Sequence, residues 1–170
     1  MKGKIILKPL LFISFLVACL MLNAQGFISK TIQHDGLTRE YSIYVPASYD
    51  GNTNFPLLFN LHGGGGNIAS HIGIADMSPI ADTANFIVVY PQARPDPSDG
   101  NSFNWINKVP GTFDDVPFFS SLIDTIASNY QIDQNRIYAC GYSLGGDMSF
   151  ELACKLNSRI AAIAPVARTM

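Results

Sequence analysis

The sequence has few charged residues and few cysteines, and it has no long block of one charge sign. Charged residues make up 14% of the 170 residues and hydrophobic residues 48%. This balance is typical of one globular, core-forming domain and excludes a disordered chain. The net charge is −2, so the chain offers no basic face for nucleic acid. A nucleic-acid partner is therefore not expected.

The longest apolar run lies near the N-terminus and extends only from Leu10 to Leu22. A permanent transmembrane helix needs roughly 20 apolar residues, so we expect no permanent transmembrane span. Lysines precede the run, and Ala24 offers a small residue for cleavage. We predict a signal peptide over residues 1–24, cleaved near Ala24, and a secreted or periplasmic domain over residues 25–170.

Only three cysteines are present, and each has a separate interpretation. Residues 16–19 read Leu-Val-Ala-Cys and resemble a bacterial lipoprotein box, so a lipoprotein anchored through Cys19 is an alternative to cleavage near Ala24. Export permits a disulfide between Cys140 and Cys154. However, the strand and helix predicted to carry them separate them by more than a disulfide spans. We expect two buried thiols instead.

Short apolar segments alternate with helical patterns along the rest of the chain. The predicted strands are Ile28–Gln33, Tyr41–Val45, Leu57–Leu61, Phe86–Tyr90, Arg136–Cys140 and Ile160–Ala164. The predicted helices are Ser78–Ala84, with Ser78 as N-cap, about Pro117–Asn129, and Leu144–Lys155. Residues 92–109 are expected to be irregular. The alternation predicts an α/β fold, a mostly parallel sheet with helices on both faces and sites beyond the carboxyl ends of its strands.

The pentapeptide from Gly141 to Gly145 has the form G-x-S-x-G and joins a predicted strand to a predicted helix. Glycines on both sides of Ser143 let the strand and helix backbones approach closely around a strained turn, which lifts the hydroxyl clear of the sheet. The motif predicts Ser143 as a nucleophile. The alternative is that Ser143 only caps the helix.

A second glycine-rich turn, residues 62–66, follows another predicted strand. The tetrahedral intermediate of acyl transfer carries an oxyanion, which fixed backbone N–H groups stabilise. One predicted donor is the N–H of Leu144, at a helix N-terminus. The other is Gly64, with Gly63 or Gly65 as alternatives. The turn lacks the G-K-[ST] ending of a phosphate-binding loop.

Three aromatic residues are candidates for a substrate-binding wall near these turns. Trp105, Phe103 and Tyr142 could form an apolar surface for an acyl or aromatic group. Core packing is the competing interpretation for at least one of them, since a lone Trp is more often structural. No metal and no cofactor is expected.

Six segments occur in a specific order: LHGGGGN at 61–67, VVYP at 88–91, DDV at 114–116, ID and RIY within 132–138, GYSLGGDM at 141–148, and AAIAPV at 161–166. This ordered set resembles secreted polyhydroxybutyrate depolymerase-like esterases, and feruloyl and acetylxylan esterases are similar. The resemblance covers about residues 41–166. It implies an α/β-hydrolase fold and hydrolysis of a carboxylic ester, in a polyester or an acylated plant polysaccharide fragment, through an acyl-serine intermediate. By position it makes Ser143 the nucleophile and Leu144 and Gly64 the oxyanion donors.

The sequence departs from this pattern after Ser143, where no histidine occurs. The α/β-hydrolase triad runs Ser, then Asp or Glu, then His. The acids that follow, Asp147 and Glu151, fall in the helix that begins at the serine, where they cannot orient a histidine across the site. A serine hydroxyl without a base is a poor nucleophile. We therefore expect an N-terminal part of an esterase, truncated after about the sixth strand, with the triad acid and base missing.

All three histidines precede the serine, at positions 34, 62 and 71. His62, together with Gly63 and Gly65, is expected to support the oxyanion loop through hydrogen bonds. An alternative to the enzyme is a catalytically dead, hydrolase-like fragment that binds a polymer or a glycan. A further possibility is a fragment that does not fold stably, because its last strand would leave an apolar sheet edge open to aggregation.

Overall fold

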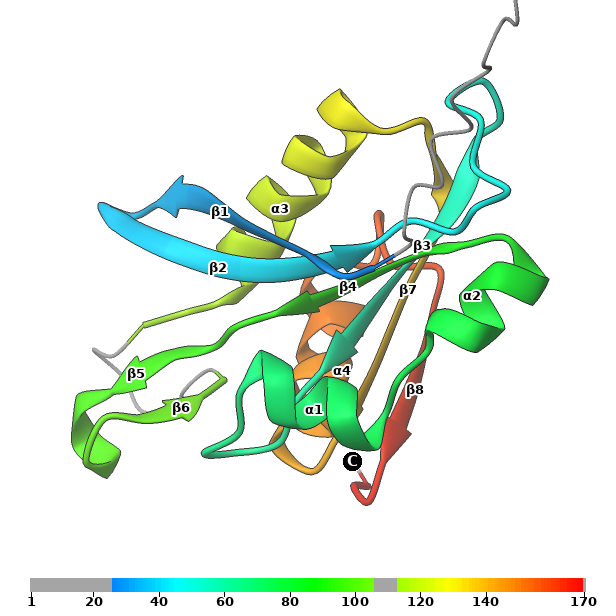
Figure 1. Cartoon of the computed structure of the whole chain (residues 1–170). Coiled ribbons are helices and arrows are strands. Elements are labelled where there is room, and N and C mark those ends of the chain that lie inside the picture. Colours follow the sequence, from blue (N-terminus) through cyan, green and yellow to red (C-terminus); the bar gives the residue numbers. More distant parts are fainter. Residues whose placement is uncertain (1–25, 106–112, 170) are drawn as a thin grey trace, which may run out of the picture.

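The computed structural model describes residues 26–105 and 113–169. The predicted signal peptide, its cleavage near Ala24 and the lipid-anchor alternative at Cys19 lie outside the described residues. Within them, six strands form one mixed sheet, and two further strands form a separate ribbon beside it (Figure 1). The α/β architecture predicted from the alternation of strands and helices is confirmed.

The elements follow one another in the order shown in Figure 1. The strands are β1 Ile28–His34, β2 Leu37–Tyr44, β3 Phe55–Leu61, β4 Ile87–Pro91, β5 Arg94–Asp96, β6 Ser102–Asn104, β7 Ile132–Tyr142 and β8 Ala162–Val166. The helices are α1 Ile68–Ile74, α2 Ser78–Ala84, the 3-10 turn η1 Pro97–Asp99, α3 Val116–Asn129 and α4 Leu144–Lys155.

The main sheet has the order β1-β2-β4-β3-β7-β8. Strands β4, β3, β7 and β8 are parallel, whereas β1 and β2 are antiparallel to their neighbours. The register aligns Leu61 with Gly141 and Gly141 with Pro165. The turns after β3 and β7 therefore leave the sheet side by side, at the carboxyl edge where α/β folds place their sites.

Strand β4 shows why both faces of the sheet are covered. Ile87 and Val89 pack into a core cluster with residues of α3 and α4, while Val88 and Tyr90 pack with Ala81 of α2 and residues of α1. Successive side chains of a strand point to opposite faces, so a continuously apolar strand supplies two cores.

Several local predictions need correction. Helix α2 has the predicted bounds, but its N-cap is Met77, and Ser78 is its first residue; the N–H of Ser78 is bound by the Asp76 carboxylate at 2.8 Å. An Asp side chain just before the helix takes the capping role that was assigned to Ser78. Helix α1, which has seven residues and follows its N-cap Asn67, was not predicted.

The segment predicted to be irregular, residues 92–109, contains the β5–η1–β6 hairpin in its described portion. Residues 106–109 lie outside the described part of the chain. The hairpin was missed because its strands are only three residues long and carry Pro95 and Asp96, which propensity disfavours in strands. The other predicted strands and helices exist, with ends shifted by a few residues.

Cys140 and Cys154 are both free thiols, so the expectation against a disulfide is confirmed. Cys140 is half-buried, and burial raises the pKa of its thiol to about 11. Cys154 is exposed on α4, so its predicted burial is wrong. Across residues 26–105 and 113–169, no helix combines the length and apolar character needed to cross a membrane.

Candidate active site

Ser143 sits between β7 and α4 in a backbone conformation that side chains rarely adopt. Its φ is 53° and its ψ is −117°. The conformation is held from both ends. The N–H of Ser143 donates to the carbonyl of Val166 at 2.9 Å, and the carbonyl of Ser143 accepts from the N–H of Gly146 at 2.8 Å. Its side chain makes no capping hydrogen bond, so the interpretation of Ser143 as a side-chain helix cap is not supported.

Gly141 and Gly145, on either side of Ser143, must be glycines because neighbouring atoms leave no room for a Cβ. A Cβ on Gly145 would lie 2.7 Å from the carbonyl oxygen of His62. A Cβ on Gly141 would lie 2.9 Å from the Cβ of Leu61 and would also collide with the carbonyl of Gly145. Helix α4 thus begins directly against the end of β3, and the serine turn is set by the packing of bare backbones.

The glycine loop after β3 packs directly on the serine turn. A Cβ on Gly63 would lie 3.2 Å from the ring of Tyr142 and 3.5 Å from the Cβ of Ser143. A Cβ on Gly64 would lie 3.4 Å from a side-chain methyl of Leu144. The structure thus brings together the two turns that the sequence analysis singled out separately.

The peptide joining Gly63 to Gly64 is oriented by hydrogen bonds to its carbonyl. That carbonyl lies 2.7 Å from Nδ1 of His62 and accepts from the N–H of Gly66 at 3.1 Å. In a trans peptide the N–H points opposite to the carbonyl, so the N–H of Gly64 is directed away from these two partners. No group among the described residues accepts a hydrogen bond from the N–H of Gly64 or of Leu144.

Gly65 differs from Gly64, because its N–H is already engaged. It donates to the carbonyl of Phe103 at 3.0 Å and to Oδ1 of Asn104 at 3.2 Å. Gly65 is therefore the weakest of the three candidate oxyanion donors, and its φ of 68° shows that its role is to turn the loop.

His62 is buried beneath the loop and uses both ring nitrogens in hydrogen bonds. Its Nε2 accepts from the N–H of Ala93 at 3.2 Å and lies 3.1 Å from Nε2 of Gln92. Because Nε2 is an acceptor, the network assigns the proton to Nδ1, which donates to the carbonyl of Gly63. Burial lowers the pKa of His62, so the ring is neutral and anchors the loop.

Gln92 and a buried ion pair hold this arrangement from behind. The side-chain oxygen of Gln92 accepts from the N–H of Ile68 at 3.0 Å. The backbone carbonyl of Gln92 accepts from the guanidinium of Arg39 at 3.1 Å. Arg39 pairs with Asp115 at 2.8 Å, with both side chains almost fully buried. Burial lowers the pKa of Arg39, and its guanidinium lies 3.8 Å from the ring centre of Phe118.

The other two histidines are committed elsewhere. Nε2 of His71 lies 2.9 Å from Oδ1 of Asn60, and burial lowers the pKa of His71 to about 4. Nδ1 of His34 lies 3.2 Å from the hydroxyl of Ser121. None of the three histidines is hydrogen-bonded to Ser143.

The two acids that follow the serine are also paired on the surface of α4. Asp147 lies 3.2 Å from Arg168, and Glu151 lies 3.1 Å from Lys155. Glu151 and Lys155 lie four residues apart, the spacing at which side chains meet on one face of a helix. Neither carboxylate contacts a histidine within the described residues.

Two of the aromatic candidates have very different exposures. Trp105 is 2% exposed, its indole N–H donates to the carbonyl of His62 at 2.8 Å, and its ring packs against Phe119. Trp105 therefore belongs to the core behind the loop, which contradicts its predicted role in substrate contact. Tyr142 is 49% exposed beside the serine, and Phe103 is partly buried against the core.

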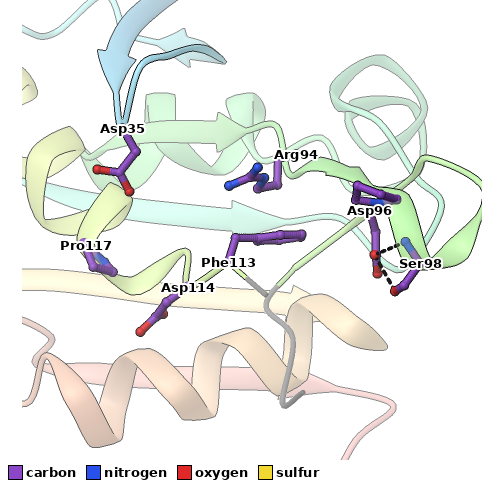
Figure 2. A pocket seen from close by; sticks show the side chains of 8 residues that line it. Asp35, Arg94, Asp96, Ser98, Phe113, Asp114 and Pro117 are labelled. Carbon is purple, nitrogen blue, oxygen red and sulfur yellow. Dashed lines mark hydrogen bonds between the residues drawn. The ribbon is translucent and has the colours of Figure 1, made fainter. Parts of the chain in front are cut away.

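A cavity of about 600 Å³ lies beside the β5–η1–β6 hairpin. Figure 2 shows the guanidinium of Arg94 above the ring of Phe113, with Asp35 on one side and the hairpin residues Asp96 and Ser98 on the other. Arg94 lies 4.2 Å from the centre of that ring. Ser143 is not among the described residues that line this cavity, so the cavity is separate from the serine turn.

No group of three or more His, Cys, Asp or Glu side chains could hold a metal ion within residues 26–105 and 113–169.

Comparison with known proteins identifies the family of the chain. The family model described as Esterase PHB depolymerase matches residues 39–168. Feruloyl esterase D of Neurospora crassa is 28% identical over 147 residues, which cover 80% of this chain and 47% of the relative. The bifunctional acetylxylan esterase/xylanase XynS20E of Neocallimastix patriciarum is 31% identical over 133 residues, 78% of this chain and 18% of that protein.

Solved structures share the fold at low sequence identity. A ferulic acid esterase superposes with a TM-score of 0.66 at 17% identity, over 82% of this chain and 58% of that one. The feruloyl esterase module from Clostridium thermocellum, an S954A mutant complexed with sinapinate, gives 0.63 at 19%, over 82% and 52%. These likenesses show the α/β-hydrolase fold. The chain spans 47% of the length of that feruloyl esterase D and 60% of the length of a probable feruloyl esterase C of Aspergillus niger.

Proposed function

The chain belongs to the PHB depolymerase esterase family, and we propose that it carries the nucleophile and the oxyanion hole of a serine ester hydrolase. The observation that carries this proposal is the strained backbone of Ser143, with φ at 53°, beside two N–H groups that no described residue accepts from. Strain at a non-glycine residue persists only where the surroundings impose it, and it clusters at active sites.

In the proposed reaction, the hydroxyl oxygen of Ser143 attacks the carbonyl carbon of an ester, and the hydroxyl proton passes to a base. The carbonyl oxygen becomes an oxyanion, which accepts hydrogen bonds from Gly64 and Leu144. Collapse of this intermediate breaks the bond to the leaving alcohol, which takes up the proton. Water then cleaves the acyl-serine, releasing the acid and restoring the hydroxyl.

The base is not supplied by the described histidines, because all three are bound to other groups. The relatives are longer than this chain. We propose that the base and its acid partner belong to the region that the relatives have in addition. In a serine protease, loss of the histidine costs about six orders of magnitude in turnover. The chain by itself is therefore expected to hydrolyse esters very slowly.

The relatives guide the choice of substrate. They include proteins described as feruloyl esterases and an acetylxylan esterase. We propose that the substrate is an ester bond in a polyester or in an acylated plant polysaccharide fragment. Tyr142, half exposed next to the serine, is the proposed contact for an apolar part of it. Export after cleavage near Ala24, with residues 25–170 as the partial esterase domain, completes the proposal.

The test measures p-nitrophenyl acetate and butyrate turnover, together with covalent labelling by a fluorophosphonate. Both are applied to this chain and to a longer form that continues through the region by which the relatives exceed it. The longer form should turn over both esters and be labelled at Ser143, and its Ser143→Ala variant should do neither. Background rates from both forms, with no labelling, would refute the enzymatic function.

A second candidate follows from the commitment of all three histidines to structural hydrogen bonds. In this case the chain is a catalytically dead, hydrolase-like fragment that binds a polymer or a glycan at the two loops. It predicts saturable binding of a soluble xylan or polyester oligomer that Ser143→Ala leaves unchanged, with no fluorophosphonate labelling of any form.

A further inference from the structure

The hairpin formed by β5, η1 and β6 reaches the glycine loop through the last residue of β6, Asn104. Its Oδ1 accepts from the N–H of Gly65 at 3.2 Å, and the carbonyl of the preceding residue, Phe103, accepts from the same N–H at 3.0 Å. Both acceptors come from a strand that is not part of the main sheet. The middle of the glycine loop is therefore tied to the hairpin.

Two carboxylates determine which way the Asn104 carboxamide faces. Its Nδ2 donates to Oδ2 of Asp99 at 2.9 Å and to Oδ2 of Asp96 at 3.4 Å. A carboxylate accepts only, so the amide nitrogen must face the two aspartates and the amide oxygen must face Gly65. The chain of hydrogen bonds thus has a single direction, from the loop through Asn104 to the aspartates.

Asp96 is itself held in place. Its Oδ1 accepts from the N–H of Ser98 at 2.9 Å and from the hydroxyl of Ser98 at 2.6 Å, as the dashed lines in Figure 2 show. These bonds, followed in importance by the bond from Asn104, lower the pKa of Asp96. Asp96 is therefore an ionised acceptor with a fixed orientation.

Asn104 also lies next to the proposed oxyanion donors. A Cβ on Gly64 would lie 3.2 Å from Oδ1 of Asn104 and 3.4 Å from a side-chain methyl of Leu144. The carboxamide oxygen and the residue after the nucleophile thus flank the same glycine. Because both polar ends of the carboxamide are engaged, Asn104 acts on the loop and not on a reacting group.

The loop is consequently held on both sides of Gly64. On one side, His62 binds the carbonyl of Gly63; on the other, Asn104 binds the N–H of Gly65. A run of four glycines has wide conformational freedom, so it needs such anchors to keep one N–H aimed at a fixed point.

We infer that Asn104 is a positioning residue of the oxyanion hole, oriented by Asp99 and Asp96, and that the hairpin thereby sets the position of the Gly64 N–H. The inference rests on the proposed function, since it gives the hairpin a task in the same site. Whatever the function, the hairpin also protects the N–H of Gly65 from exchange, through Asn104 together with the carbonyl of Phe103.

The experiment breaks the hydrogen bond between Asn104 and Asp99 and then restores it in the opposite direction. Asn104→Asp keeps an acceptor for Gly65 but sets a third carboxylate against Asp99 and Asp96. In the double variant Asp99→Asn with Asn104→Asp, the amide at position 99 donates to the carboxylate at position 104. The hydrogen bond between the two side chains is thus restored in the opposite direction. Asn101→Asp is the matched control, because it adds the same charge to an exposed position of the same hairpin.

Two measurements are made on each variant, with circular dichroism to verify folding. In this chain, hydrogen exchange at the Gly65 amide should be faster in Asn104→Asp, and normal in the double variant and in Asn101→Asp. In the longer form, the rate constant for fluorophosphonate labelling of Ser143 should fall about 10- to 100-fold in Asn104→Asp, as expected for a misplaced catalytic group. The double variant should recover most of that loss.

Equal exchange and labelling in Asn104→Asp and Asn101→Asp would overturn the inference, as would a double variant that recovers neither. If Asn104→Asp does not fold, Asp99→Asn alone removes the carboxylate that lies nearer to Asn104 and carries the same expectations in weaker form. If the wild type is never labelled, the proposed function fails, whereas the exchange measurement still decides whether Asn104 holds the loop.

Discussion

The serine turn and the glycine loop lie in contact but are held in shape by different forces. The serine turn is confined by backbone sterics, since Gly141 and Gly145 touch the end of β3 with no room for a Cβ. The glycine loop is confined by side-chain hydrogen bonds from His62 and Asn104, which come from different parts of the chain. The difference teaches that the residue types of the nucleophile turn are readable as one short motif, whereas the oxyanion loop also needs a side chain, Asn104, from a separate hairpin.

The largest effect should come from breaking the support behind the glycine loop. Asp115→Ala leaves the guanidinium of Arg39 buried without its carboxylate, so we expect the free energy of unfolding to fall by about 3–5 kcal/mol. Urea denaturation measures this. Asp124→Ala is the control, because the Asp124 carboxylate that pairs with Arg159 is 69% exposed, and such a pair contributes less than about 1 kcal/mol. Equal losses in both variants would contradict this view of the support.

The next largest effect should come from the serine turn. Gly145→Ala forces a Cβ against the carbonyls of Leu61 and His62, so we expect a loss of about 1–3 kcal/mol, as for an overpacked core. Gly73→Ala is the matched control. No atom lies within 4 Å of the added Cβ in α1, and we expect a gain of up to about 1 kcal/mol. Thermal and urea unfolding compare the two, and a harmless Gly145→Ala would show that the turn is not set by sterics.

Acid should lower the stability of the folded chain through two buried histidines, His62 in the glycine loop and His71 in α1. The pKa of His71 is lowered from 6.5 to about 4, and that of His62 is also lowered, in both cases chiefly by burial. Between these pH values the unfolded chain binds protons that the folded chain does not, so stability is present above about pH 6.5 and is lost as the pH falls toward 4. Melting temperature against pH should fall in this window, and His71→Gln should flatten the fall. An identical profile in the variant would assign the loss to other groups.

The smallest effect should come from the strained backbone conformation of Ser143. Ser143→Gly relieves the strain of a side chain at φ 53°, so we expect stability to rise by about 1 kcal/mol. Ser143→Ala keeps a Cβ and should not share this gain. Chemical denaturation of the two variants distinguishes them, and a lower stability for Ser143→Gly would argue against a strained nucleophile turn.

The sequence predicted the strands and helices that carry strong periodicity, including α4 at its observed bounds. It missed α1, which has seven residues and lacks the Ser-Pro start that marks α2, and the β5–β6 hairpin, whose strands have three residues each. It offered Trp105 as a substrate contact, with core packing as the competing interpretation, and it placed Cys154 in the interior; the structure buries Trp105 and exposes Cys154. A lone residue type does not reveal which side of an element faces the core.

Within the site, the roles of Gln92, Arg39 and Asn104 had no signal in the sequence. Each lies far along the chain from the glycine loop or its histidine and reaches them through one or two hydrogen bonds. Asp115 pairs with Arg39 in the core, a partner that only the fold brings near.

The sequence alone determined the α/β order, the two turns at strand ends and the nucleophile turn around Ser143, because these follow from periodicity and from short glycine motifs. The tertiary structure decided which N–H groups are left for an oxyanion, and which histidines are already bound to other groups. Those properties depend on where distant polar groups meet, and such meetings are set by packing across the whole sheet.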